Sequence, residues 1–210
     1  MNTRARPRFG SRRRLIASSL WLGALGTLAW TRARPLHARD ARDLRPPGAL
    51  APGAFEAACV RCGLCVRACP PQALHLSTET EGPAPPGTPH LRVRERPCLM
   101  CDGLPCVRAC PTGALDPALQ RAGAMRIGLA SLSDPKACFS YTGAAACRHC
   151  WSACPLKNRA LRMRAGATPL GGRLAPVVDA EACTGCGLCE HACVAAAPAI
   201  TVRLPGDGPA

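Results

Sequence analysis

The sequence predicts a small, loop-rich α+β fold that is built from repeated short units and held together through its cysteines. Aromatic residues make up only 3% of the 210-residue chain, which contains 16 cysteines, 20 glycines and 22 prolines. A chain with so few large apolar side chains and so many turn formers usually needs covalent or metal links for stability. The cysteines also recur in sets, and short segments with β propensity flank these sets.

Four sets of four cysteines account for all 16. The first set lies at 59–70 in the run CVRCGLCVRACP, the second at 98–111, the third and loosest at 138–155, and the fourth at 183–194. A proline follows the last cysteine of the first three sets, and a valine follows that of the fourth. In chain order the members are Cys59, Cys62, Cys65, Cys69, Cys98, Cys101, Cys106, Cys110, Cys138, Cys147, Cys150, Cys154, Cys183, Cys186, Cys189 and Cys193.

Each set is flanked by segments that we expect to form short strands. A short apolar pair follows every set: Ala73-Leu74, Ala114-Leu115, Ala160-Leu161 and Ala199-Ile200. Further strands are predicted at LRVRE (91–95), APVVD (175–179) and AITVRL (199–204). Each unit should therefore run from a strand through a cysteine loop and a brief helical turn around the fourth cysteine to a second strand. We expect the repeats to form a domain over 39–203, with a flexible tail at 204–210.

Three kinds of link would use these thiols: disulfides, zinc ions or iron–sulfur clusters. An even number of cysteines suits disulfides, but cysteines so close in sequence bind a shared metal more readily than they bridge one another. Structural zinc usually takes two CxxC pairs from separate segments. The run CxxCxxCxxxCP is the pattern of bacterial ferredoxins, where three thiolates hold one 4Fe–4S cluster and the fourth reaches a partner cluster. The sequence therefore favours four 4Fe–4S clusters in tandem bacterial ferredoxin-like modules, each holding two.

A fourth cysteine that serves another set's cluster requires the sets to work in pairs. The residues alone allow two schemes. In one, the first set pairs with the second and the third with the fourth. In the other, which is nested, the first set pairs with the fourth and the second with the third.

The net charge of +14 does not indicate a nucleic-acid partner. Residues 1–38 contain eight arginines and no acidic residue, so the rest of the chain carries +6. Four oxidised clusters with their thiolates would add about −2 each, which brings the loaded domain close to neutrality. The chain also has no basic stripe interleaved with aromatic residues. We therefore expect it to bind no nucleic acid.

The first 38 residues have the layout of an export signal. Arg12, Arg13 and Arg14 directly precede an uncharged, mildly apolar segment at 15–31. Consecutive arginines in this place are typical of a twin-arginine signal in bacteria. The alternative is a membrane anchor, although 17 uncharged residues are at the short limit for a span. We expect the twin-arginine export machinery to deliver the domain to the periplasm, where an uncleaved signal would tether it to the inner membrane.

The arginine-rich start, the order of the four sets and the stretch MRIGLASLSDPKACFSYTGAAACRHCWSACPLKNRAL at 125–161 resemble the NapG/MauM family of ferredoxin-type proteins. The resemblance covers roughly residues 10–203. It implies an exported protein with four clusters, whose ligands would be the sixteen cysteines. The form CxxCxxxxCxxxCP of the second set is also similar to that in four-cluster subunits of molybdenum oxidoreductases. This second resemblance implies the nested pairing.

The family resemblance implies a redox function with two branches. One branch passes electrons from a membrane quinol-oxidising iron–sulfur partner to a periplasmic oxidoreductase such as nitrate reductase. The other accompanies methylamine dehydrogenase, in electron transfer or in maturation of that enzyme. A third alternative is a bound iron–sulfur subunit of a larger oxidoreductase. The sequence contains no GxGxxG, P-loop, GxSxG or HExxH motif. We therefore expect an electron carrier with no catalytic residues of its own.

Overall fold

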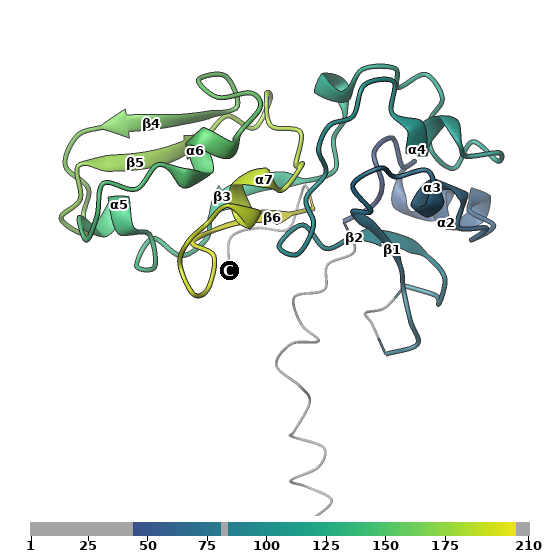
Figure 1. Cartoon of the computed structure of the whole chain (residues 1–210), viewed down its shortest axis with the longest axis horizontal. Coiled ribbons are helices and arrows are strands. Elements are labelled where there is room, and N and C mark those ends of the chain that lie inside the picture. The colour runs from purple at the N-terminus through teal and green to yellow at the C-terminus, as the bar shows by residue number, and fades with distance from the viewer. Residues whose placement is uncertain (1–43, 81–83, 205–210) are drawn as a thin grey trace, which may run out of the picture. The chain divides into compact units, whose positions relative to one another are not determined.

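The computed structural model describes residues 44–80 and 84–204 (Figure 1). These residues belong to one compact unit that extends over Ala41–Ala210. The predicted signal or anchor at 1–38 lies outside the described residues, and so does the predicted tail beyond residue 204. Within the described ranges, no helix combines the length and the apolar character needed to cross a bilayer.

The first part of the unit, residues 44–119, carries the first two cysteine sets and is called the first module here. It contains the helices α2 (Pro52–Ala58), α3 (Leu64–Arg67) and α4 (Pro105–Arg108) and the strands β1 (Leu74–Leu76) and β2 (Pro89–Leu91). β1 and β2 pair antiparallel, and an isolated bridge joins Ala49 to Leu115. The segment after the first set therefore pairs with the segment before the second, and the segment before the first pairs with the segment after the second.

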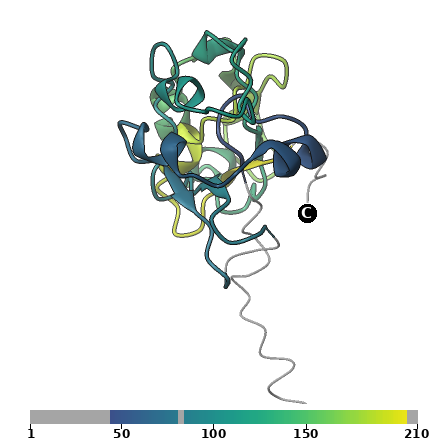
Figure 2. The ribbon, with the colours of Figure 1, turned by 90° about the vertical axis from the view of Figure 1, so that its right-hand side faces the viewer.

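The second module, residues 125–204, repeats this arrangement with the third and fourth sets. After the short η2 turn (Ala122–Ala124) it contains β3 (Leu129–Leu132), α5 (Phe139–Thr142), α6 (His149–Ala153), β4 (Leu161–Ala165), β5 (Leu174–Val178), α7 (Leu188–His191) and β6 (Ile200–Arg203). β3 pairs antiparallel with β6, and β4 with β5. Figure 1 shows the labelled elements of each module gathered together, and the first module faces the viewer in Figure 2.

Most of the helices are a single turn long, too short to be stable by themselves. Their ends are fixed by residues with special backbone conformations. α2 and α4 begin with a proline, whose missing N–H costs nothing in the first turn. Gly63 and Gly187 precede α3 and α7 with φ values of 72° and 82°, a left-handed conformation that glycine adopts without strain. The same four letters, CGLC, thus build the same turn in the first and fourth sets.

The core contains few large side chains, as the composition predicts. Its fully buried members include Phe55, Leu104, Leu115, Met125 and Ile200. Buried cysteines from the first, second and fourth sets belong to the same cluster of core residues. Sulfur atoms therefore occupy positions that large apolar side chains fill in most domains of this size.

Two expectations about local structure are wrong. The helical turns carry the third cysteine of each set, and the fourth cysteine follows the end of the helix. In the first three sets the proline after the fourth cysteine has no N–H to continue a turn, and in the fourth set, where Val194 takes its place, α7 likewise ends before Cys193. In the predicted strand 91–95, only Leu91 is in β2, and the chain then turns at 93–95. The turn directs Arg94 towards carbonyl groups of the second module. The strands predicted at 175–179 and 199–204 are confirmed as β5 and β6.

Candidate functional site

The sixteen cysteines line four cavities, four cysteines to each. The cavities are similar in size, with two of about 370 Å³ and two of about 340 Å³. Site 1 is lined by Cys59, Cys62, Cys65 and Cys110, and site 2 by Cys69, Cys98, Cys101 and Cys106. Site 3 is lined by Cys138, Cys147, Cys150 and Cys193, and site 4 by Cys154, Cys183, Cys186 and Cys189.

Each cavity takes three cysteines from one set and the fourth from another, and the exchange is between neighbouring sets. The first set exchanges its last cysteine with the second, and the third exchanges with the fourth. The nested pairing that we favoured by resemblance is therefore wrong for this structure. The physical reason is the strand pairing: β1–β2 closes the first module and β4–β5 the second, so each last cysteine lies beside the cavity of its module partner.

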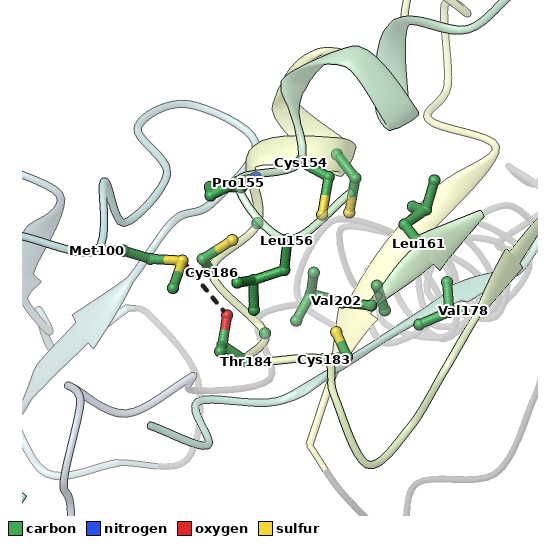
Figure 3. A pocket seen from close by; sticks show the side chains of 15 residues that line it. Met100, Cys154, Pro155, Leu156, Leu161, Val178, Cys183, Thr184, Cys186 and Val202 are labelled. Carbon is green, nitrogen blue, oxygen red and sulfur yellow. Dashed lines mark hydrogen bonds between the residues drawn. The ribbon is translucent and has the colours of Figure 1, made fainter. Parts of the chain in front are cut away.

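The sulfur atoms of a site lie around a space and do not converge on one point. Among residues 44–80 and 84–204, no three or more His, Cys, Asp or Glu side chains are placed to hold a single metal ion. All sixteen cysteines are free thiols in the structure. Figure 3 shows the arrangement at site 4, where Cys154, Cys183 and Cys186 surround a space shared with apolar side chains such as Leu156 and Val202.

Burial and mutual repulsion disfavour thiolates at these sites when nothing neutralises them. Burial, with repulsion from Cys59 and Cys110, raises the pKa of Cys65 to about 11. Burial, with repulsion from Cys98 and Cys69, raises the pKa of Cys106 to about 12. In the second module, burial raises the pKa of Cys150 to about 11, and burial also raises the pKa of Cys189. A cationic iron core in each cavity would reverse this balance, because metal ions favour the thiolate form.

Some of the exchanged cysteines receive hydrogen bonds that favour a thiolate. The N–H of Ala73 donates to Sγ of Cys69 at 3.3 Å, and the N–H of Ala199 donates to Sγ of Cys193 at 3.4 Å. Burial acts to raise the pKa of Cys110, but the N–H groups of the segment after it, including that of Ala114, lower the pKa overall. These are the alanines of the apolar pairs. The repeat was visible in the sequence, whereas the role of its N–H group became clear only in the structure.

Other residues contact the cysteines in ways that the sequence did not indicate. The hydroxyl of Ser140 lies 3.4 Å from Sγ of Cys138 at site 3. Met100, from the loop of the second set, lines site 4 in the other module. His149, which directly precedes Cys150, lines site 3. His191, between Cys189 and Cys193, places Nδ1 2.8 Å from the carbonyl oxygen of Arg94.

Comparisons with known proteins agree with this arrangement. The model of the 4Fe–4S dicluster domain family matches residues 58–114 and 145–197. The first match spans the first two cysteine sets, and the second spans the fourth set and the third set from Cys147 onwards. The methylamine utilization ferredoxin-type protein MauM of Methylobacillus flagellatus is 45% identical over 186 residues, which cover 89% of this chain and 77% of the relative. The ferredoxin-type protein NapG of Escherichia coli K12 is 40% identical over 208 residues, covering 96% and 89%. MauM of Methylorubrum extorquens is 41% identical over 207 residues, covering 97% and 93%. No solved structure matches the chain.

Two dicluster domains correspond to four 4Fe–4S clusters, and the cavities fit that number. Within the described residues, four cavities of nearly equal volume each contain four cysteines, and their other lining residues are predominantly apolar. Four thiolates are the usual ligand set of a 4Fe–4S cluster. The exchange of cysteines within a module also agrees with the matched ranges. The protein therefore holds four 4Fe–4S clusters, two in each module.

Proposed function

Because the chain belongs to the NapG/MauM family of ferredoxin-type iron–sulfur proteins, we propose that it relays electrons in the periplasm. The donor in this proposal is a membrane quinol-oxidising iron–sulfur protein. The acceptor is a periplasmic oxidoreductase such as nitrate reductase. The sixteen cysteines hold the clusters in the four groups described above, and the clusters supply one-electron redox chemistry.

The observation that carries the proposal is the sharing of cysteines between the two sites of each module. Cys69 leaves the first set to line site 2, and Cys110 leaves the second set to line site 1. Two clusters joined in this way lie close to one another, so an electron that reaches one can pass to the other. The protein matrix contributes the remaining requirements of a carrier. It holds the sulfur atoms in place, surrounds them with apolar side chains and directs N–H groups at Cys69 and Cys193.

Export by the twin-arginine route is part of the proposal. A cofactor that is inserted in the cytoplasm must cross the membrane in a folded protein, and the arginines at 12–14 supply the matching signal. Replacing Arg12, Arg13 and Arg14 together by lysine keeps the charge and removes the arginine pair. The variant should remain in the cytoplasm with its iron, whereas a control with Arg32 and Arg34 replaced by lysine should be exported. Export of both variants would refute the twin-arginine route.

An EPR-monitored redox titration of the anaerobically purified protein tests the relay, with iron and sulfide counted on the same sample. We expect four clusters, at least some of which titrate near the potential of the quinol pool. Quinol-containing membranes with the donor protein should then reduce the clusters, and nitrate with its periplasmic reductase should reoxidise them. Clusters that are reducible only far below any quinol would refute the quinol relay.

The MauM relatives support a second candidate, an accessory function in methylamine utilization. In that case the protein would act in electron transfer for methylamine dehydrogenase or in its maturation. A maturation function predicts that methylamine dehydrogenase assembled beforehand works without this protein, whereas an electron carrier would be needed in every turnover. A bound iron–sulfur subunit is distinguished from both because it would copurify with a catalytic chain.

A further inference from the structure

The two modules meet at a buried seam between site 2 and site 4. The N–H of Cys98, a residue of site 2, donates to the carbonyl oxygen of Cys186, a residue of site 4, at 2.9 Å. Both cysteines are buried. The two sites are thus linked by a direct hydrogen bond between residues that line them.

Met100 adds a second link across the seam. It lies between Cys98 and Cys101 in the loop of site 2, yet its side chain lines the cavity of site 4. The hydroxyl of Thr184 donates to Sδ of Met100 at 3.7 Å, as the dashed line in Figure 3 shows. Thr184 is itself buried and stands between Cys183 and Cys186. A polarisable thioether from one module therefore forms part of the wall of a site in the other.

The backbones at the seam approach too closely for any side chain on Gly187. A Cβ added there would lie 2.2 Å from the Cβ of Val93, which is buried in the first module. Arg94 then fastens the two segments, because its Nη1 donates to the carbonyl oxygens of Glu190 at 2.7 Å and of Cys193 at 2.8 Å. Arg94 lines none of the four sites described above, so its contact stabilises the seam without touching a cluster site. Cys98 and Met100, in contrast, belong to the loop of site 2.

From these contacts, and resting on the proposed relay, we propose that the segments 98–100 and 184–186 form the electron bridge between the modules. The four sites then lie in the linear order 1, 2, 4, 3. The first and last steps use the cysteines exchanged within each module, and the middle step uses the seam. At each step one site is oxidised by one electron and the next is reduced by one, and no bond forms or breaks.

The burial of the cysteines supports this order independently. Site 4 has three buried cysteines and site 2 has two, whereas site 1 has one and site 3 has none. Cys62 of site 1 is exposed, and so are the apolar side chains of Val60 beside site 1 and Phe139 and Val194 beside site 3. A linear relay needs shielded middle sites and accessible ends, which is the distribution found here. Electrons therefore enter and leave at sites 1 and 3.

Magnetic coupling between reduced clusters tests the order without any donor or acceptor. Four variants would each remove one site through its third cysteine: Cys65→Ala for site 1, Cys106→Ala for site 2, Cys150→Ala for site 3 and Cys189→Ala for site 4. Iron counts establish that three clusters remain, and EPR spectra of the fully reduced proteins report which of them interact. Removing an inner site should leave one cluster with an isolated, uncoupled spectrum. Removing an outer site should leave three clusters in an unbroken line, each magnetically coupled to at least one neighbour.

The proposal is overturned if removal of site 2 leaves the site 1 spectrum coupled, or if removal of site 1 or site 3 isolates another cluster. The wild-type protein supplies a test that needs no variant. In chains reduced by two electrons, pulsed dipolar EPR should detect a weak coupling from the pair at the two ends of the line. Strong coupling in every pair would mean a compact arrangement and would refute the order. Failure of the quinol relay would leave these results unchanged, so the two proposals fail separately.

Discussion

A single added methyl group at Gly187 should destabilise the protein strongly, because the modules meet there without space for a side chain. Its Cβ would lie 2.2 Å from the Cβ of Val93 and 2.6 Å from Cγ1. Overpacking of this kind costs about 1–3 kcal/mol. The φ value of 82° adds about 1–2 kcal/mol for any L residue with a side chain. We therefore expect Gly187→Ala to lower the free energy of unfolding by about 2–5 kcal/mol.

Gly63 supplies the matched control. It occupies the same position of the same CGLC sequence in the first set and has a φ value of 72°. A Cβ on Gly63 would meet only Cδ1 of Leu76 at 3.7 Å, an ordinary contact. Gly63→Ala should therefore lower the free energy of unfolding only by the backbone contribution, about 1–2 kcal/mol. The difference between the two variants in free energy of unfolding therefore measures the cost of the steric clash between the modules at Gly187.

Thermal unfolding of the anaerobic proteins, followed by cluster absorbance and circular dichroism, measures this difference. One scan rate must be used throughout, because loss of clusters makes unfolding irreversible. At about 2–4 °C per kcal/mol for a protein of this size, Gly63→Ala should lower Tm by about 2–8 °C and Gly187→Ala by about 4–20 °C. A Val93→Gly change should restore part of the loss in Gly187→Ala, whereas Val93→Ala, which keeps the Cβ, should not. Equal losses in the two glycine variants would refute the close approach.

Three further predictions concern the sites themselves. Cys110→Ala should abolish site 1 and Cys106→Ala should abolish site 2, and each variant should contain about 12 iron atoms per chain instead of about 16. Because different clusters remain, the Mössbauer and EPR spectra of the two variants should differ. Identical spectra would contradict the exchange of cysteines. Ser140→Ala should lower the reduction potential of one cluster by removing the hydroxyl beside Cys138, and the exposed Ser152→Ala on α6 is the control that should leave all potentials unchanged. Reconstitution of the cluster-free protein with iron and sulfide should release protons and become more complete as pH rises from 7 to 9, because burial and repulsion raise the pKa of thiols such as Cys106 to about 12 and protons compete with iron for them. Iron content that is the same across this pH range would contradict the last prediction.

The local features of the fold could be predicted from the sequence because they depend on residues that are close in the chain. Three of the four apolar pairs after the cysteine sets mark strand positions correctly, since β1, β4 and β6 begin at Leu74, Leu161 and Ile200. In the remaining pair, Leu115 forms only an isolated bridge with Ala49. The number of cavities follows from the number of sets. The left-handed turn in each CGLC sequence is likewise local, since it requires only the glycine between two cysteines.

The pairing of the sets could not be predicted, because nested and neighbouring pairings leave the same local pattern around each cysteine. The choice depends on which strands meet, and β1–β2 and β4–β5 meet as antiparallel neighbours across their connecting segments. The predicted strand at 91–95 failed for a related reason. Its alternating pattern is real, but the turn at 93–95 brings Arg94 to the carbonyl of Glu190, 96 residues away in sequence. A contact at that separation has no local signature.

The seam also explains why the protein depends on its clusters for more than redox chemistry. Cys98, Cys106, Cys186 and Cys189 are members of the hydrophobic core and line the two inner cavities. With so few large apolar residues, the core has no other side chains to fill these cavities, and empty space in a core is destabilising. Burial also raises the pKa of these thiols and so favours their protonated form. A core without clusters would therefore be underfilled, and its cysteines would remain protonated. The clusters at sites 2 and 4 therefore have a structural role as well as a redox role. They stabilise the same buried contacts between the modules that would carry the electron.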